Sequence, residues 1–180
     1  MAFRIVIGDV TIGIQGQDFA YIFSVGMGGM ESLYKDGKEW LYRAPRPAFW
    51  RAATDNDRGN GFVFRSAVWS AADRFVRCVK VTARMDVKDL KMELTGKSTA
   101  TLTGAVRYLS LFVSTGKLEA AGLEVMAAEA NVTSSGVAAL WVTDRFQGKT
   151  STGGKITYKG APPIVRSGAK FMGGDITRVE

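Results

Sequence analysis

Apolar and polar residues alternate along much of the first half of the chain, which is typical of β-strands. The alternation runs through residues 3–14 with a break at Gly8-Asp9, and an aromatic, β-branched run follows at residues 18–25. Residues 30–43 predict a hairpin that turns at Asp36-Gly37, because this dipeptide suits the positive φ angles of a tight turn. These patterns predict antiparallel strands joined by short turns.

The middle of the chain mixes an irregular segment with further strands. Prolines make a helix or central strand unfavourable across residues 44–60. Residues 67–75 contain good helix formers and predict a short helix that carries Trp69 inward. Alternation returns at residues 76–85, and two or three more strands are expected within residues 90–94 and 99–113, so antiparallel β-structure is predicted up to this point.

The last third has a different pattern. Residues 117–130 are rich in Ala, Leu, Glu and Met, and four apolar positions follow a helical spacing: Leu118, Ala121, Val125 and Ala128. This pattern favours a helix there. Residues 148–160 are rich in Gly, Lys, Thr and Ser, which predicts a weakly specified segment. We identify no internal repeat in the sequence.

Composition narrows the classes of function. The 180 residues suffice for one domain with its own core, so residues 1–180 are expected to form a single domain. The sequence contains no histidine, which excludes Ser-His-Asp and Cys-His nucleophilic systems and His-bound metal sites. Cys78 is the one cysteine and lies among valines, which favours a small buried side chain in a strand.

The charge and the N-terminus concern partners and location. The net charge is +7, but the basic residues are interleaved with acids, so an acidic protein partner is favoured over nucleic acid. No apolar run approaches the roughly 20 residues of a membrane span. The N-terminus lacks the basic start and apolar core of a secretory leader. A cytoplasmic location without membrane contact is therefore expected.

The most specific signal is residues 49–61, FWRAATDNDRGNG. This segment resembles the F-W-R-A-P-T-D-N-D-R-G-x-G run that opens the C-terminal domain of family 2 β-galactosidases. Where those enzymes are split in two, the same domain is the separate small chain. Ala53 stands where the family often has Pro. Flanking pieces appear in family order, so the resemblance covers roughly residues 3–82.

The resemblance implies a large antiparallel β-supersandwich similar to galactose mutarotase. It implies that this domain packs on the catalytic (β/α)-barrel of a β-galactosidase and helps to close the sugar pocket. The catalytic glutamates then belong to a large chain or another domain, and this chain carries no catalytic residue and needs no cofactor. Galactoside hydrolysis and carbohydrate binding would be functions of the assembled glycoside hydrolase. After about residue 82 the family pattern stops, which a truncated domain, a divergent domain or a changed reading frame would each explain.

The candidate site residues are those of the motif: Trp50, Arg51, Asp55, Asn56, Asp57 and Arg58. An EF-hand loop is rejected because glycine and glutamate are absent from its sixth and twelfth positions, and no metal site is predicted, although a looser cation site is an alternative. A structural role is favoured, in which the carboxylates bond backbone N–H groups and nearby arginines. An interface with the catalytic domain, or a sugar contact, is the other interpretation.

Two alternatives to the accessory role come from the aromatic residues and the implied fold. Aromatic side chains are frequent in one zone of the chain and could stack on sugars in a stand-alone carbohydrate-binding β-sandwich; they are Trp40, Tyr42, Phe49, Trp50 and Trp69. A mutarotase would need histidine together with glutamate, and the absence of histidine argues against it.

Overall fold

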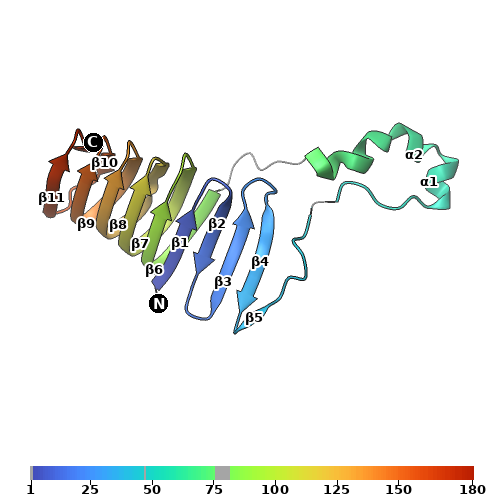
Figure 1. Ribbon diagram of the computed structural model, residues 1–180, viewed down its shortest axis with the longest axis horizontal. Helices are drawn as coiled ribbons and strands as arrows, with labels where there is room; N and C mark the ends of the chain where they lie inside the picture. The colour runs from blue at the N-terminus through green and yellow to red at the C-terminus, as the bar shows by residue number, and fades with distance from the viewer. Residues whose placement is uncertain (1, 47, 76–81) are drawn as a thin grey trace.

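The computed structural model describes residues 2–46, 48–75 and 82–180. Three parts follow one another along the long axis of the molecule: a wound stack of strands, a flat antiparallel sheet and a helical arm (Figure 1). Within the described ranges, no helix is long and apolar enough to cross a membrane. The prediction for Cys78 and for a strand at residues 76–81 falls outside the described residues, as does the one for Pro47.

The N-terminal sheet is a meander of five antiparallel strands. Its β3–β4 pairing contains a register shift between Ile22 and Phe23. The predicted hairpin is confirmed: β4 and β5 are joined by Asp36 and Gly37, whose φ angles are 50° and 78°. The strands are β1 (Ala2–Ile7), β2 (Thr11–Gln15), β3 (Phe19–Ser24), β4 (Gly29–Lys35) and β5 (Lys38–Glu39).

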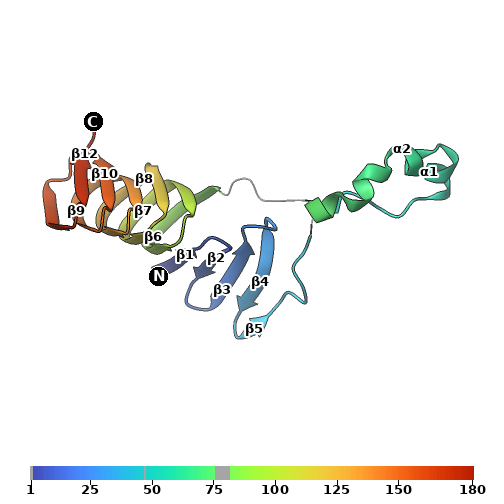
Figure 2. The same cartoon turned by 45° about the horizontal axis from the view of Figure 1, so that its top comes forward.

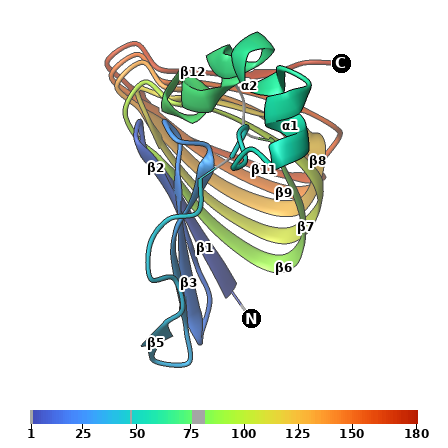
Figure 3. The ribbon, with the colours of Figure 1, turned by 90° about the vertical axis from the view of Figure 1, so that its right-hand side faces the viewer.

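The C-terminal part is a solenoid-like stack of parallel strands. Four of its strands are long and bend, so that each forms most of one coil, as the nested curves of Figure 3 show. β9 pairs with β10 through its first residues and with β11 through its last. The strands are β6 (Thr82–Leu94), β7 (Thr99–Ser114), β8 (Lys117–Thr133), β9 (Val137–Ser151), β10 (Lys155–Lys159), β11 (Ile164–Phe171) and β12 (Asp175–Arg178).

The core lies inside the coils and is built from rows of stacked apolar side chains. One row joins Leu94, Val113 and Val132, and each step advances the sequence by 19 residues. All three side chains are fully buried. The structure therefore contains a repeat that sequence inspection did not find. The sequence feature that marks this repeat is a Ser or Thr beside Gly just after each long strand. At Thr115, Ser135 and Thr152 this residue adopts the positive φ angle of the turn.

The sheet and the solenoid share one continuous network of strands. β1 pairs in parallel with β6, with Ile5 opposite Met92 and Ile7 opposite Leu94. Ile5 and Ile7 are buried and belong to the same core cluster as the coil residues. The first strand of the chain therefore closes one end of the solenoid core, although its own neighbour β2 is antiparallel to it (Figure 2).

The predicted helix at residues 117–130 is wrong, because this segment is part of β8. Its alanines suit a strand that stacks closely between two others, and Ala120, Ala128 and Ala130 are buried. Pairing on both sides outweighs the helical propensity of the segment. The weakly specified segment expected at residues 148–160 is also wrong, since it contains the end of β9 and all of β10.

Antiparallel pairing was predicted up to residue 113 and is confirmed for β1–β5 only. β6 and β7 are strands as expected, but they pair in parallel. The fold class is confirmed as all-β, with a solenoid-like arrangement of its second half. The single domain and the β-supersandwich stay predictions.

Candidate functional site

The family motif lies on the arm, residues 40–75, which leaves the sheet after β5 and extends away from it (Figures 1 and 2). Glu39 fixes the start of the arm, because one of its carboxylate oxygens accepts the backbone N–H groups of Leu33 and Leu41, each at 2.9 Å. The other oxygen accepts the Ser32 hydroxyl. These hydrogen bonds lower the pKa of Glu39, with that from Ser32 the main cause.

Three short helical segments follow along the arm. They are α1 (Asp55–Gly59), α2 (Phe62–Arg65) and the 3₁₀-helix η1 (Ala67–Phe75). α1 packs on α2, and α2 on η1. The short helix expected at residues 67–75 is thus found as a 3₁₀-helix, but Trp69 does not point inward, since 56 % of it is exposed.

Helix α1 begins at Thr54 for a local reason. The Thr54 hydroxyl accepts the Asp57 N–H at 3.3 Å, and the Asp57 carboxylate accepts the Thr54 N–H at 2.8 Å. This reciprocal pair is a capping box, which satisfies two N–H groups that have no partner within the helix. The Asp-Asn-Asp run of the motif is therefore the first turn of a helix.

Asp57 is the centre of the site. Both of its carboxylate oxygens accept from the Arg51 guanidinium, at 2.6 and 3.0 Å, and the Thr54 hydroxyl donates to it at 2.8 Å. Asp57 is buried, with 9 % of its surface exposed. We call Arg51, Thr54 and Asp57 the Asp57 cluster. It has the bidentate arginine–carboxylate geometry that fixes two segments in one orientation.

The Asp57 cluster is charged at neutral pH. The hydrogen bond from Arg51 is the main cause that holds the pKa of the Asp57 carboxyl far below its ordinary value, and the hydrogen bonds from Thr54 add to it. The bond to Asp57 in turn raises the pKa of Arg51. A carboxylate that is this hard to protonate cannot donate a proton as a general acid. The electrostatics of Asp57 thus favour a structural role.

The remaining site residues differ in their surroundings. Trp50 stacks on Phe62, with ring centroids 5.4 Å apart and planes 12° apart, and Arg51 lies over the same Phe62 ring. Asp55 and Arg58 form an ion pair at 3.3 Å with both side chains exposed to solvent. Asn56 is also exposed, on the surface of α1. The structure therefore brings Arg51 and Asp57 together and leaves Asp55, Asn56 and Arg58 on the surface.

Large apolar side chains are exposed at several places along the arm. Phe64 is 85 % exposed, and sequence inspection did not single it out. The sequence feature that could have indicated Phe64 is the Phe-Val-Phe run directly after the motif. The other large apolar residues that are exposed in the described part of the arm are Trp40, Tyr42, Phe49, Val68 and Trp69. An arm that is fixed internally and apolar outside is suited to packing on another surface.

Comparisons with known proteins find similarities of two kinds. The β-galactosidase small subunit of Latilactobacillus sakei is 51 % identical over 90 residues, which are 50 % of this chain and 28 % of that protein. Two β-galactosidases, from Halalkalibacterium halodurans and Clostridium acetobutylicum, are 45 % and 51 % identical over 80 and 69 residues, or 44 % and 38 % of this chain and 8 % of each enzyme.

The first half of this chain resembles part of a β-galactosidase small subunit. The predicted resemblance is thereby confirmed, and the chain spans less than a third of the length of the relatives it matches. Residues 77–162 match a different family model, described as the head GIN domain of a putative auto-transporter adhesin. This match covers most of the solenoid, and it begins close to residue 82, where the β-galactosidase pattern in the sequence stops.

Proposed function

We propose that this chain is an accessory, non-catalytic part of a β-galactosidase and that the arm is the element that packs on the catalytic domain. The observation that carries this proposal is the contrast within the arm. The Asp57 cluster fixes its shape, while aromatic side chains such as Phe64 and Trp69 face solvent.

The proposed contact involves the predicted site residues in two ways. Trp50, Arg51 and Asp57 hold the arm in the shape that the partner recognises. Asp55, Asn56 and Arg58 lie on its surface and would contact the catalytic domain or the sugar directly. A basic chain would also be attracted to an acidic face of the partner.

Several finer features belong to the same proposal. The assembled enzyme would act on a galactoside in the cytoplasm, as part of carbohydrate metabolism. Within that enzyme this chain would form a single domain. The β1–β5 sheet would take the place of the corresponding strands of a mutarotase-like β-supersandwich. The continuous pairing from β5 to β12 supports one folded unit.

The test is reconstitution with a catalytic β-galactosidase large chain that is inactive alone. We expect the mixture to hydrolyse a chromogenic galactoside and the isolated chain to be inactive. Phe64→Ala and Trp69→Ala should weaken the association, because each removes exposed aromatic surface from the arm. Met126→Ala, on the exposed surface of the solenoid, is the matched control. Association that is unaffected by both arm variants would contradict the proposal.

A stand-alone carbohydrate-binding module is the second candidate. It is favoured by the exposed rings of Trp40 and Tyr42 near the start of the arm, since exposed aromatic faces stack on sugars. Retention of the isolated chain on a galactoside matrix, lost on Trp40→Ala and unaffected by Phe64→Ala, would favour this candidate over the accessory role.

A further inference from the structure

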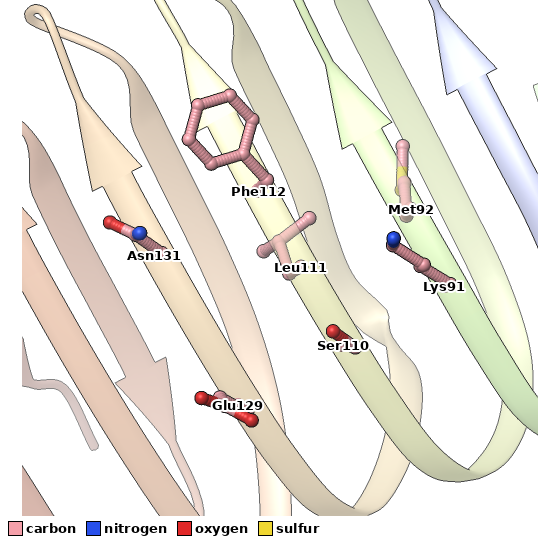
Figure 4. Close-up of a pocket in the computed structure, with 7 residues that line it drawn as sticks. All are labelled: Lys91, Met92, Ser110, Leu111, Phe112, Glu129 and Asn131. Carbon is pink, nitrogen blue, oxygen red and sulfur yellow. The ribbon is translucent and has the colours of Figure 1, made fainter.

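A shallow hollow lies on the outer surface of the solenoid, lined by residues between 91 and 131. Its volume is about 220 Å³, and side chains from β6, β7 and β8 surround it (Figure 4). This is below the roughly 300–1,000 Å³ of pockets that enclose a drug-sized ligand. The hollow can therefore take one small ring or one residue of a longer chain.

The register of the strands produces the hollow. Lys91, Ser110 and Glu129 occupy neighbouring positions in one row across β6, β7 and β8. The short Ser110 side chain lies between two long ones, and adjacent strands are about 4.8 Å apart, so the two long side chains rise roughly 10 Å from each other. The next row places Phe112 between Glu93 and Asn131. Because paired strands fix these positions, the hollow is preformed.

The chemistry of the walls is mixed in a specific way. Phe112 offers a ring that is 38 % exposed. Lys91 supplies donors, Glu129 supplies acceptors, and the Asn131 amide and the Ser110 hydroxyl supply both. Lys91 and Glu129 have opposite charges, and the Lys91 ammonium also pairs with Glu93 at 3.5 Å, so the hollow has no net attraction for a phosphate or another anion. A hydroxyl-rich neutral ring with one apolar face satisfies all of these groups.

A second aromatic ring extends the surface along β7. Tyr108 lies four residues before Phe112 on the same outward face and is 52 % exposed. Four residues of a strand span about 13 Å. The register neighbour of Tyr108 on β8 is Ala127, which is too small to cover the phenol ring. Two exposed rings with a polar hollow between them match a linear ligand better than a single ring.

We propose that this surface, formed by Tyr108, Ser110 and Phe112 with Lys91, Glu129 and Asn131, binds a neutral oligosaccharide lying along β7. The rings of Tyr108 and Phe112 pack on the apolar faces of sugar residues, and the side chains of the hollow bond the hydroxyls between them. This site needs no catalytic partner and is separate from the surface of the arm.

The experiment is a titration of the purified full chain with three β-1,4-linked tetrasaccharides: cellotetraose, chitotetraose and galactotetraose. We expect at least one to bind with a Kd below about 1 mM. Phe112→Ala should weaken that binding by roughly tenfold, and Phe112→Trp should retain it because the larger ring offers the same stacking face. The matched control is Phe64→Ala, which removes an exposed phenylalanine of the arm instead.

Backbone amide chemical shifts place the binding. The expected changes occur at residues 108–112 and 129–131, and circular dichroism establishes that each variant is folded. The proposal is overturned if none of the tetrasaccharides binds when its concentration is raised to about ten times that Kd limit. Equal affinity of Phe112→Ala and Phe64→Ala, or shifts confined to residues 40–75, would also overturn it.

Discussion

At the scale of single residues, Asp57 connects the sequence motif to the shape of the arm. It accepts hydrogen bonds from a side chain six positions earlier and from both the N–H and the hydroxyl of the cap residue. This agrees with the structural role expected from the sequence, because the partners are close along the chain. By contrast, the exposure of Trp69 depends on where the arm lies relative to the rest of the chain. The local sequence pattern around Trp69 did not predict this exposure.

The first prediction concerns the Asp57 cluster. Asp57→Ala should abolish the protection of the Thr54 amide from hydrogen exchange, because that amide bonds the Asp57 carboxylate. Thr54→Ala should cost the arm about 1 kcal/mol through loss of the cap. Asp55→Ala is the control and should change little, since exposed ion pairs contribute about 0–1 kcal/mol. Full protection of Thr54 in Asp57→Ala would contradict this assignment.

The same cluster predicts a pH dependence. The folded-state pKa of Asp57 lies below the unfolded value of about 3.9, so its stabilising contribution is complete above that value. The contribution is lost as the pH falls through the folded-state pKa. The stability of the arm relative to Asp57→Asn should therefore be constant from about pH 5 to 8 and decrease in stronger acid. Hydrogen exchange corrected for its intrinsic rate measures this difference.

Gly104 gives a third prediction at the residue scale. Its φ is +116°, and an added Cβ would overlap the carbonyl oxygen of Met85. Gly104→Ala should destabilise the protein by about 1–3 kcal/mol in urea unfolding, because neither the backbone angle nor the neighbouring coil can accommodate a side chain. Gly13→Ala, which meets nothing within 4 Å and has an ordinary φ, should be nearly neutral.

At the scale of elements, turns were predictable and strand partners were not. The Asp36-Gly37 turn is specified by two adjacent residues, and the sequence predicted it correctly. Parallel pairing between β6 and β7 joins residues that are 19 positions apart, and the apolar pattern within either strand does not indicate it. β8 shows the difficulty best. Its Ala, Leu and Glu residues favour a helix locally, and only the strands on either side of it turn the segment into β-structure.

Substitution of aspartate for two adjacent alanines, one at a time, should distinguish the observed strand β8 from the helix that the sequence favoured. Ala120 is fully buried in β8, whereas Ala121 is partly exposed; the helical pattern had placed Ala121 inside. Ala120→Asp should destabilise the chain by about 3–5 kcal/mol, because it places an uncompensated charge in the core. Ala121→Asp should be tolerated. Thermal unfolding of the two variants checks the order, and a greater loss for Ala121→Asp would favour the helix.

At the scale of the whole molecule, two sequence patterns share one core. β1 carries the start of the β-galactosidase-like half, and its isoleucines complete the core of the adhesin-like half. Ile5→Ala should therefore destabilise the solenoid by about 2–5 kcal/mol. Ile22→Ala, in the same sheet but 40 % exposed, is the control. Hydrogen exchange at residues 90–94 should report the loss, and unchanged protection there would mean that β1 does not close the core.

The arm should respond to proteolysis independently of this core. Arg43 is exposed in the irregular segment that leads into the arm, whereas Lys117 and Lys155 lie within paired strands. Brief trypsin treatment should therefore cleave after Arg43 first, because cleavage requires local opening and the paired strands open rarely. Mass spectrometry of the early fragments identifies the first cleavage site. A first cleavage within the solenoid would contradict the expectation that the arm opens more readily than the paired strands.

The pairing of β1 with β6 also affects how the protein is made. Ala2 pairs with Asp89, so β1 leaves the ribosome before its partner β6, which is synthesised nearly ninety residues later. At about 5–20 residues per second this delay lasts several seconds or more. During that time Ile5 and Ile7 lie in an incomplete sheet, and the edge of β1 that will face β6 has no hydrogen-bonding partner. The chain is therefore open to chaperones, and to pairing with a neighbouring nascent chain, until its sixth strand appears.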